Sequence, residues 1–352
     1  MKAAFLTKKS TAQKSFEIRE TNKPKMQPNE ILIKVSAFGL NYADVMARLG
    51  LYPEMPPMPA ILGYDVCGEI EEIGDQVTGF HVGDHVLALT RFRGYAEYAV
   101  SDSRACMVVD ASLPSYKKLA MATQLSTAYY AAVECVNFHE GDNVLVYAAA
   151  GGVGLGIVQI ALNKKCNVIA VASSVEKLSF LKSLGVTHTI NYKEQDIFQY
   201  LKDHNLYRKI DFIFDSVGGD YVKKGMKAIQ NGGKYVLFGA SKLSGPKNKL
   251  KVIFEAIKFG TTFYSPPQFL MPSKSIIGIN MLAIADNKPE VIARCMRGVY
   301  DYYQDGIITH IEGKNYPIED LAIAHDLLEH GKTIGKLAIE WSSNSKNINP
   351  SN

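Results

Sequence analysis

The sequence has few cysteines, no pair of cysteines separated by two residues, and no strong excess of charge of either sign. Its five cysteines are an odd number, which argues against a disulfide framework and a four-cysteine zinc lobe and favours a reducing compartment. The formal net charge is only +4, and no local cluster of Lys and Arg is dense enough to predict nucleic-acid binding. We therefore expect a cytoplasmic protein without a nucleic-acid partner.

Long hydrophobic runs are also missing. Lysines interrupt the apolar residues between Met1 and Lys9 before a signal-peptide core could form. An uncharged stretch from Val144 to Val158 is shorter than the roughly 20 residues of a membrane-spanning helix, and four glycines interrupt it. Neither an export signal nor a membrane span is expected.

The composition is that of a globular protein, with 47% hydrophobic and 21% charged residues, and 352 residues suggest two domains. The first third contains short β-like runs separated by Gly, Pro and Asn, which indicates a small antiparallel β domain. From about Leu119 onward, apolar strands alternate with amphipathic helical segments such as Val175 to Leu184. Such alternation is typical of an α/β, doubly wound parallel sheet with helices on both faces.

The later part of the chain predicts a return to the first domain. After a last parallel strand near Ser275 to Ile279, two helical stretches and the run Lys336 to Glu340 are too few for a third domain. The expected division is a first domain at residues 1–122, completed by residues 281–341, a second domain at residues 123–280, and a disordered polar tail at residues 342–352.

The strongest local signal is a glycine turn between a strand and a helix. The strand from Val144 runs into Gly151, Gly152, Val153 and Gly154, and helical spacing follows. This pattern is typical of a dinucleotide-binding turn, in which backbone approaches the pyrophosphate and helix N-terminal amides face the phosphates. Ala149 stands where the usual pattern has its first glycine. A bare tight turn is the alternative interpretation.

The residues after the next two strands favour NADPH over NADH. NAD-binding versions of this fold carry an acidic residue at the end of the second strand, but here that strand ends in Ser173 and Ser174. Lys177 follows, and Tyr192 comes after the third strand. An ammonium and hydroxyl groups can bind a 2′-phosphate that a carboxylate would repel. Alternatively, Lys177 lies on a solvated helix face.

These motifs resemble the medium-chain dehydrogenase/reductase superfamily, in particular its zinc-free quinone oxidoreductases. The resemblance covers nearly the whole chain, and the order of its motifs makes it specific. Within the family, the segments at residues 47–52, 185–188 and 243–248 look most like the vesicle amine transport protein branch. The matching motifs are at residues 39–44, 50–53, 94–98, 126–129, 148–154, 190–192, 215–219 and 331–336.

The resemblance implies a GroES-like β-rich catalytic domain, a Rossmann domain, a cofactor in the cleft, and a homodimer joined through Rossmann sheet edges. Asn41 and Tyr52 would face the nicotinamide. The implied cofactor contacts, together with the glycine turn, are Thr127, Gly151, Gly152, Val153, Ser173, Lys177, Tyr192, Ser216, Phe238, Gly239 and Ser241.

A catalytic metal is not expected. Zinc-bearing relatives place a cysteine where this chain has Asn41, and a histidine followed by an acid where it has Tyr64 and Asp65. Without zinc to stabilise an alkoxide, the acceptor should be one that spreads the incoming charge, such as a quinone or an α,β-unsaturated carbonyl. Hydrogen bonds from the Asn41 amide and the Tyr52 hydroxyl would then suffice.

Both residues also have structural interpretations. Asn41 could cap a helix from Tyr42 to Leu49, with Asp44 at the third helical position and Gly50 as terminator. Tyr52 could simply pack against the proline-rich loop. Many quinone oxidoreductases have a second tyrosine where this chain has Met46, so we expect solvent to provide the proton.

A basic amphipathic segment at residues 242–274 supports a second hypothesis. Its lysines, interleaved with apolar residues, suit contact with an anionic membrane surface, and equally a helix that covers a cleft or a dimer partner. The two function classes are thus an NADPH-dependent reductase and an NADPH-binding protein with a membrane- or partner-association role and little turnover.

Overall fold

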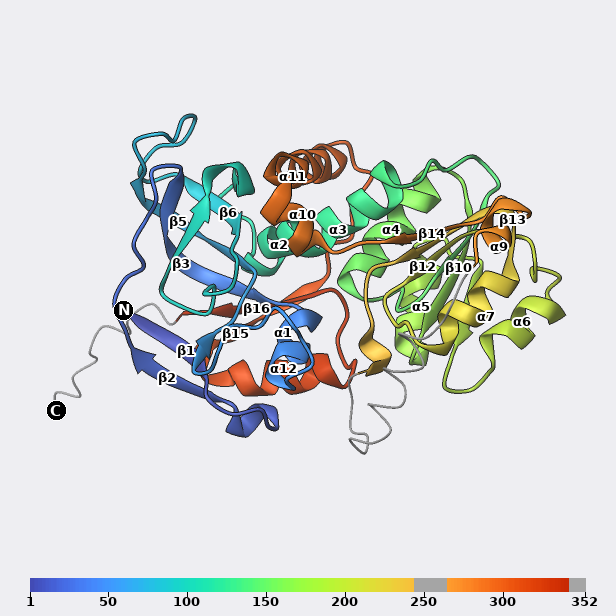
Figure 1. Cartoon of the computed structure of the whole chain (residues 1–352), viewed down its shortest axis with the longest axis horizontal. Coiled ribbons are helices and arrows are strands. Elements are labelled where there is room, and N and C mark those ends of the chain that lie inside the picture. Colours follow the sequence, from blue (N-terminus) through green and yellow to red (C-terminus); the bar gives the residue numbers. More distant parts are fainter. Residues whose placement is uncertain (244–264, 342–352) are drawn as a thin grey trace. The chain divides into compact units, whose positions relative to one another are not determined.

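The computed structural model describes residues 1–243 and 265–341, and the chain divides into two units (Figure 1). The first unit contains residues 1–122, 313–329 and those from Lys336 onward, and the second contains residues 123–312 and 330–335. Most of the predicted basic segment, residues 244–264, and the predicted tail, residues 342–352, lie outside the described residues. Among the described residues, no helix is both long and apolar enough to cross a membrane.

The first unit is built on a mostly antiparallel β-sheet, as a GroES-like domain should be. Its larger sheet has the order β15-β16-β3-β5-β6-β8, with β7 also paired to β3, and a smaller sheet has the order β2-β1-β4. The strands are β1 (Lys2–Leu6), β2 (Phe16–Glu20), β3 (Glu30–Leu40), β4 (Ala60–Ile61), β5 (Asp65–Ile73), β6 (His85–Leu89), β7 (Tyr98–Asp102), β8 (Cys106–Val108), β15 (Gly313–Pro317) and β16 (Lys336–Glu340). The helices are α1 (Tyr42–Arg48), α2 (Ser115–Leu119) and α12 (Leu321–Glu329).

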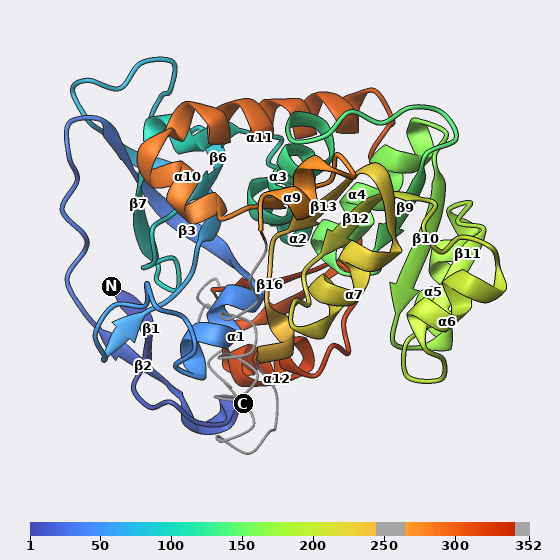
Figure 2. The ribbon, with the colours of Figure 1, turned by 45° about the vertical axis from the view of Figure 1, so that its right-hand side comes forward.

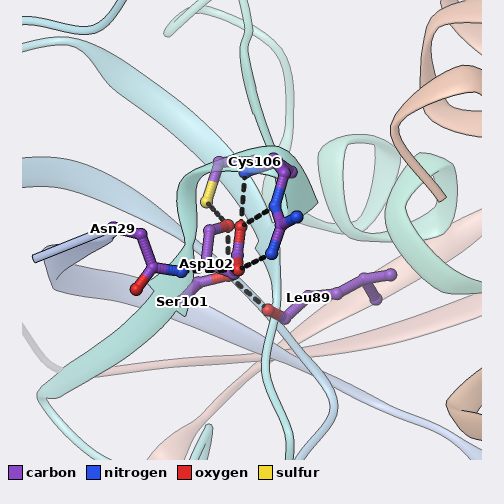
Figure 3. A network of polar contacts seen from close by, with 6 residues as sticks. Asn29, Leu89, Ser101, Asp102 and Cys106 are labelled. Atoms are coloured by element: carbon purple, nitrogen blue, oxygen red, sulfur yellow. Dashed lines mark hydrogen bonds and ion pairs between the residues drawn. The ribbon is translucent and has the colours of Figure 1, made fainter. Parts of the chain in front are cut away.

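A polar network fixes the corner between β7 and β8 (Figure 3). Arg104 donates to both carboxylate oxygens of Asp102, at 2.9 and 2.7 Å, and Asn29 donates to the same carboxylate at 2.8 Å. The hydrogen bond from Arg104 is the main reason that the pKa of Asp102 is lowered. Ser101 donates to the carbonyl of Leu89 on β6, and the Cys106 thiol donates to the carbonyl of Asp102. The network therefore joins strand ends that are distant in sequence.

The second unit is a parallel sheet between helices, which confirms the predicted doubly wound Rossmann-like fold. Its strand order is β11-β10-β9-β12-β13-β14, and every pairing is parallel. The strands are β9 (Asn143–Val146), β10 (Asn167–Ala172), β11 (His188–Asn191), β12 (Ile210–Asp215), β13 (Ile229–Leu237) and β14 (Ser275–Gly278). The helices are α3 (Ser126–Tyr129), α4 (Gly152–Asn163), α5 (Val175–Ser183), α6 (Ile197–Asp203), α7 (Asp220–Ala228), α9 (Pro267–Leu270), α10 (Met281–Asn287) and α11 (Pro289–Gln304).

Both faces of this sheet are buried. Successive side chains of a strand point to opposite faces, so each strand contributes residues to two separate clusters. Helices flank the sheet (Figure 2). On β9, Val144 and Val146 belong to one buried cluster with residues of α4 and α5, whereas Leu145 and the following Tyr147 belong to a second cluster with residues of α6 and α7. The uncharged stretch of the sequence is thus a buried strand, a turn and a buried helix.

The structure places the return to the first unit later than the predicted boundary. Residues 281–312, expected in the first domain, belong to the second unit. Gly298 of α11 lies so close to the Tyr129 ring that a Cβ atom would be 2.3 Å from it, and Arg294 forms an ion pair with Glu134. Close packing of α11 onto the helical segment around Tyr129 holds these residues in the second unit. The periodicity of the sequence predicts that α11 is a helix but not which segment it packs against.

All five cysteines are free, and their burial affects their chemistry. Cys67, Cys106, Cys166 and Cys295 are buried, and Cys135 is half-buried. Burial raises the pKa of the Cys67 thiol to about 11 and the pKa of each of the other three buried thiols to about 12. It also raises the pKa of Cys135. These thiols therefore stay protonated near neutral pH.

Candidate functional site

The residues predicted to bind the cofactor follow the carboxyl ends of the parallel strands. Strand β9 ends at Val146 before the glycine turn, β10 ends before Ser173, β11 before Tyr192, β12 before Ser216 and β13 before Phe238. Carboxyl ends of parallel strands lie along one edge of a sheet, which is where ligands bind in open α/β folds. The sheet topology thus gathers most of the predicted contacts along one edge of the second unit.

The glycine turn brings backbone very close to backbone. Gly151 is the N-cap of α4, with no side-chain capping hydrogen bond, and the first turn of the helix carries no acidic residue. A Cβ atom on Gly154 would lie 2.5 Å from the carbonyl oxygen of Ala148, so a side chain does not fit at this position. Ala148 itself has a φ of +50°, a left-handed conformation that favours glycine. The uncapped helix start provides amide groups and a dipole that attract a phosphate.

Gln124 lies against this turn and was not predicted from the sequence. It is 9% exposed, and its Oε1 atom has no hydrogen-bond partner among the described residues. A Cβ atom on Gly152 would lie 1.8 Å from that oxygen, so the amide takes the space that only a glycine leaves free. A buried carbonyl oxygen without a donor suits a ligand that brings one, such as a hydroxyl or carboxamide group of a nucleotide. A lone glutamine before a helix gives no signal in the sequence.

Thr127 makes a local hydrogen bond. Its hydroxyl donates to the carbonyl of Thr123 at 2.7 Å, and the side chain is 9% exposed. Because the hydroxyl proton is used in this bond, Thr127 could only accept a hydrogen bond from a ligand.

Lys177 is held in place beside the end of β10. Its ammonium donates to the carbonyl of Gly331 at 2.7 Å, and its backbone N–H donates to Ser174, the N-cap of α5, at 3.5 Å. Burial lowers the pKa of Lys177, and the nearby charge of Lys193 lowers it further. Lys177 is therefore a half-buried cation rather than a freely solvated lysine, and Lys193 is a second cation that sequence reasoning missed.

Tyr192 is open to solvent, and one acid accompanies the cations. The Tyr192 side chain is 47% exposed although its backbone N–H is bonded to Ala172 at 3.2 Å. Glu176, in the first turn of α5, accepts a hydrogen bond from the Ser174 hydroxyl at 3.1 Å. The two lysines outnumber this one carboxylate, so the local balance of these groups is positive.

The Asp215 side chain joins the end of β12 to β13. The buried carboxylate of Asp215 accepts from the amides of Val217 and Gly218, at 2.6 and 3.0 Å, and from the Tyr235 hydroxyl at 2.6 Å. This arrangement turns the chain sharply after Asp215. The residues predicted here, Ser216, Phe238, Gly239 and Ser241, are all partly exposed.

Gly239 and Ser241 lie directly beside Ser216. A Cβ atom on Gly239 would lie 2.7 Å from the Ser216 carbonyl oxygen, and the Ser241 amide donates to that oxygen at 3.1 Å. The loops after β12 and β13 thus meet at Ser216, at the same sheet edge as the glycine turn.

In the first unit, Asn41 belongs to a buried ionic network. The fully buried Lys336 ammonium lies 2.5 Å from the Asp65 carboxylate and donates to Asn41 Oδ1 at 2.9 Å. Asn41 Nδ2 donates in turn to Asp65 Oδ1 at 2.5 Å. A Cβ atom on Gly39 would lie 2.4 Å from both partners of the ion pair, so a glycine is needed beside it. The network fixes the direction of the Asn41 amide. It uses one of the two N–H groups of Nδ2, and the second can donate to another acceptor.

Asp44 has a structural role next to Asn41. Asn41 is the N-cap of α1, and its backbone N–H donates to Asp44 Oδ2 at 2.9 Å. The Gly63 amide donates to the other carboxylate oxygen at 3.2 Å. Burial raises the pKa of Asp44 to about 7, with the Asp65 charge adding to the rise and the hydrogen bond from Asn41 opposing it. Helix α1 ends at Arg48, and the chain leaves it through Gly50, whose φ of +74° suits a glycine.

Tyr52 and Tyr64 form an aromatic pair after α1. Their ring centroids lie 6.1 Å apart in an edge-to-face arrangement, and Phe92 packs 5.0 Å from the Tyr64 ring. Tyr52 is half-buried, whereas Tyr64 is only 7% exposed. Burial raises the pKa of both hydroxyls. Both tyrosines therefore remain protonated near neutral pH.

The side chains at positions 41, 64 and 65 do not fit the zinc site that related dehydrogenases place there. An amide and a phenol replace the thiolate and the imidazole that Zn²⁺ prefers. The carboxylate of Asp65 is already bound by Lys336 and Asn41. The ammonium of Lys336 supplies the positive charge that this buried carboxylate requires.

Comparison with known proteins identifies the family of both units. Residues 27–123 match the alcohol dehydrogenase GroES-like domain, and residues 152–296 match the zinc-binding dehydrogenase family. A probable quinone oxidoreductase of Schizosaccharomyces pombe is 31% identical over 90% of this chain and 90% of that protein. The human synaptic vesicle membrane protein VAT-1 homolog is 29% identical over 92% of this chain and 82% of that protein.

Solved structures give the same result. A mycobacterial protein complexed with NADPH is 26% identical, with a TM-score of 0.81 over 97% of this chain and 99% of that one. The Escherichia coli quinone oxidoreductase complexed with NADPH is 23% identical, has a TM-score of 0.82, covers 97% of this chain and 100% of its own, and supports the fold alone. The chain therefore belongs to the medium-chain dehydrogenase/reductase superfamily, as its ordered motifs predicted.

Proposed function

We propose that this protein is a zinc-independent, NADPH-dependent reductase that transfers hydride to a quinone or an α,β-unsaturated carbonyl compound. The observation that carries the proposal is the uncapped start of α4 at the glycine turn, on the same sheet edge as Lys177 and Tyr192. Family membership supports it, since relatives named quinone oxidoreductases align over 90% of this chain.

The residues present fit NADPH. The amides at the start of α4 would face the pyrophosphate, and the unpartnered Gln124 oxygen would accept from a nucleotide hydroxyl or carboxamide. Lys177, with Lys193 nearby, would bind the 2′-phosphate beside Ser173 and Tyr192. The neighbour crystallised with NADPH supports this choice.

When bound, the nucleotide supplies a hydride, and the residues of this chain bind and orient the acceptor. Asn41 keeps one N–H available in a direction fixed by Asp65 and Lys336, and the Tyr52 hydroxyl is a second donor. We assign these two donors to the acceptor oxygen or to the nicotinamide ribose. Two hydrogen bonds suffice for an acceptor that spreads the incoming charge over a conjugated system. Solvent supplies the proton.

Turnover with an acceptor panel tests the proposed function. Purified protein would be mixed with NADPH and a series of quinones and enones while the nicotinamide absorbance is followed. We expect consumption of NADPH with at least one acceptor, and consumption that is unaffected by a zinc chelator. If no acceptor is reduced although NADPH binds tightly, the reductase assignment is wrong.

The second candidate function would then be favoured, namely NADPH binding combined with membrane or partner association. The relatives named synaptic vesicle membrane proteins are the observation that keeps this candidate. Sedimentation with anionic liposomes, weakened by salt, would support it, because surface electrostatic attraction is screened by ions.

We also propose a homodimer joined through β14. This strand is the end of the parallel sheet in the described part of the chain and pairs only with β13 there. An edge strand offers a row of N–H and C=O groups that a second copy can pair with. Light scattering should give twice the mass of the chain, and a monomer at micromolar concentration would contradict this.

A further inference from the structure

Tyr64 carries a buried hydroxyl that neither the fold nor the proposed function uses. The residue is 7% exposed, and its Oη atom has no hydrogen-bond partner among the described residues. A buried hydroxyl without a partner is unfavourable, so such groups are rare in folded proteins. Phenylalanine would pack equally well against Phe92 and avoid that cost. The hydroxyl therefore calls for a functional explanation.

The surroundings of the Tyr64 hydroxyl point to Tyr52 as its partner. The two rings meet edge to face, with centroids 6.1 Å apart. Burial raises the pKa of Tyr52, and the Tyr64 hydroxyl partly opposes that rise, as a neighbouring donor would. Tyr64 is too deeply buried to reach a substrate, whereas Tyr52 is half-buried. Any influence of Tyr64 on an acceptor must therefore pass through Tyr52.

We propose that Tyr64 is a positioning residue, whose hydroxyl donates to the Tyr52 oxygen when Tyr52 donates to the carbonyl oxygen of a bound quinone or enone. This inference rests on the proposed function. A phenol that accepts one hydrogen bond becomes a better donor in the next, since chained hydrogen bonds polarise one another. Many quinone oxidoreductases have a second tyrosine where this chain has Met46. In this chain, Tyr64 would strengthen the hydrogen bond to the acceptor in its place.

In this arrangement neither tyrosine gives up its proton during the reduction. The electron pair of the hydride enters a carbon atom of the acceptor, and negative charge collects on the acceptor oxygen. Tyr52 and Tyr64 keep their protons throughout, because burial raises the pKa of both. The proton that completes the reduction comes from water. No further reactant is needed.

The test combines Tyr64→Phe and Tyr52→Phe in a double-mutant cycle. With an acceptor that the wild-type protein reduces, we expect Tyr64→Phe to lower kcat about fivefold to tenfold with KM nearly unchanged, the size of effect that one hydrogen bond gives. In the Tyr52→Phe background, the same change should have no further effect. Equal losses in both backgrounds would overturn the proposal.

Two further measurements do not require turnover. Tyr64→Phe should raise the pKa of Tyr52, followed by the ultraviolet absorbance of the phenolate in alkaline titration with Tyr52→Phe as the reference. The Tm of Tyr64→Phe should stay close to that of the wild-type protein, because the phenyl ring keeps its packing against Phe92. A matched control is Tyr95→Phe, which removes a buried hydroxyl that is bonded to His325 at 3.1 Å and should lower Tm without moving the pKa of Tyr52.

The outcomes separate the two proposals. If no acceptor is reduced by the wild-type protein, the proposed function fails, and the Tyr52 titration still decides whether the tyrosines are coupled. If the wild-type protein is active and Tyr64→Phe changes neither kcat nor the pKa of Tyr52, the positioning role is wrong while the reductase assignment stands.

Discussion

Lys177 is the residue on which the choice between NADPH and NADH depends. Lys177→Ala removes the half-buried ammonium beside the end of β10, so NADPH should bind at least tenfold more weakly while NADH binding changes little. Fluorescence titration with both nucleotides measures this. Lys182→Ala, which removes an exposed lysine from the same helix, is the matched control. Equal weakening of both nucleotides would remove the 2′-phosphate assignment.

Ala148 holds a left-handed conformation that glycine adopts without strain. Such a conformation costs a non-glycine residue about 1–2 kcal/mol, whereas glycine adds about 0.5–1 kcal/mol of unfolded-state entropy. Ala148→Gly should therefore leave the free energy of unfolding unchanged or raise it by up to about 1 kcal/mol. Urea denaturation measures the change. The nearby Ala150→Gly, at a position without positive φ, should instead lower stability.

Sequence reasoning at this scale succeeded where a residue acts within its own neighbourhood. Asn41 as a helix cap and Gly50 as the terminator of α1 follow from local rules, and the structure confirms both. Lys336 and Asp65 were missed as partners of Asn41, because their contact depends on tertiary pairing between distant strands. Gln124 and the unpartnered Tyr64 hydroxyl were missed because only burial makes them unusual.

At the scale of elements, the tight approach between the glycine turn and α4 makes a separate prediction. Gly154→Ala would place a Cβ atom 2.5 Å from the Ala148 oxygen and 2.8 Å from the Ala149 Cα, both backbone atoms that cannot move aside cheaply. We expect a loss of about 1–3 kcal/mol in unfolding free energy and weaker NADPH binding. Thermal denaturation and nucleotide titration would measure these. Gly278→Ala, where nothing lies within 4 Å of the added atom, should cost much less.

The elements of the second unit could be predicted well because their signals are periodic. Strands such as β9 are mainly apolar, and both of their faces are buried, which produces the continuous apolar runs in the sequence. Short or polar strands in the first unit, such as β2 and β15, carry no comparable pattern. They are strands because they pair with β1 and β16, and pairing partners cannot be read from local composition.

At the scale of the whole molecule, two buried groups of the first unit oppose each other in the pH dependence of stability. Burial lowers the pKa of His325 to about 3, so between pH 3 and 6.5 the unfolded chain binds a proton that the native protein does not. The contribution of His325 to stability is therefore lost as pH falls. Asp44, whose pKa is raised to about 7, keeps its proton in the native protein when the unfolded chain has lost it. Its contribution to the stability of the protein therefore falls as pH rises between 3.8 and 7.

Replacing His325 should expose the Asp44 contribution. Moving from pH 7.5 to pH 5 should cost the wild-type protein about 2 kcal/mol through His325, a cost that His325→Gln avoids. Denaturation in urea at the two pH values measures the difference between the proteins. His85→Gln, which replaces an exposed histidine of the same unit, should preserve the wild-type pH dependence. A pH dependence of His325→Gln identical to that of the wild type would contradict this assignment.

The burial of the thiols has a consequence for a protein proposed to handle quinones and enones. Such acceptors are electrophiles that add readily to thiolates, and an enzyme with reactive cysteines would be alkylated by its own substrates. Because none of the five cysteines has a pKa favourable to ionisation near neutrality, the native fold shields the protein from this covalent inactivation. Unfolding removes the shield and exposes every cysteine to attack.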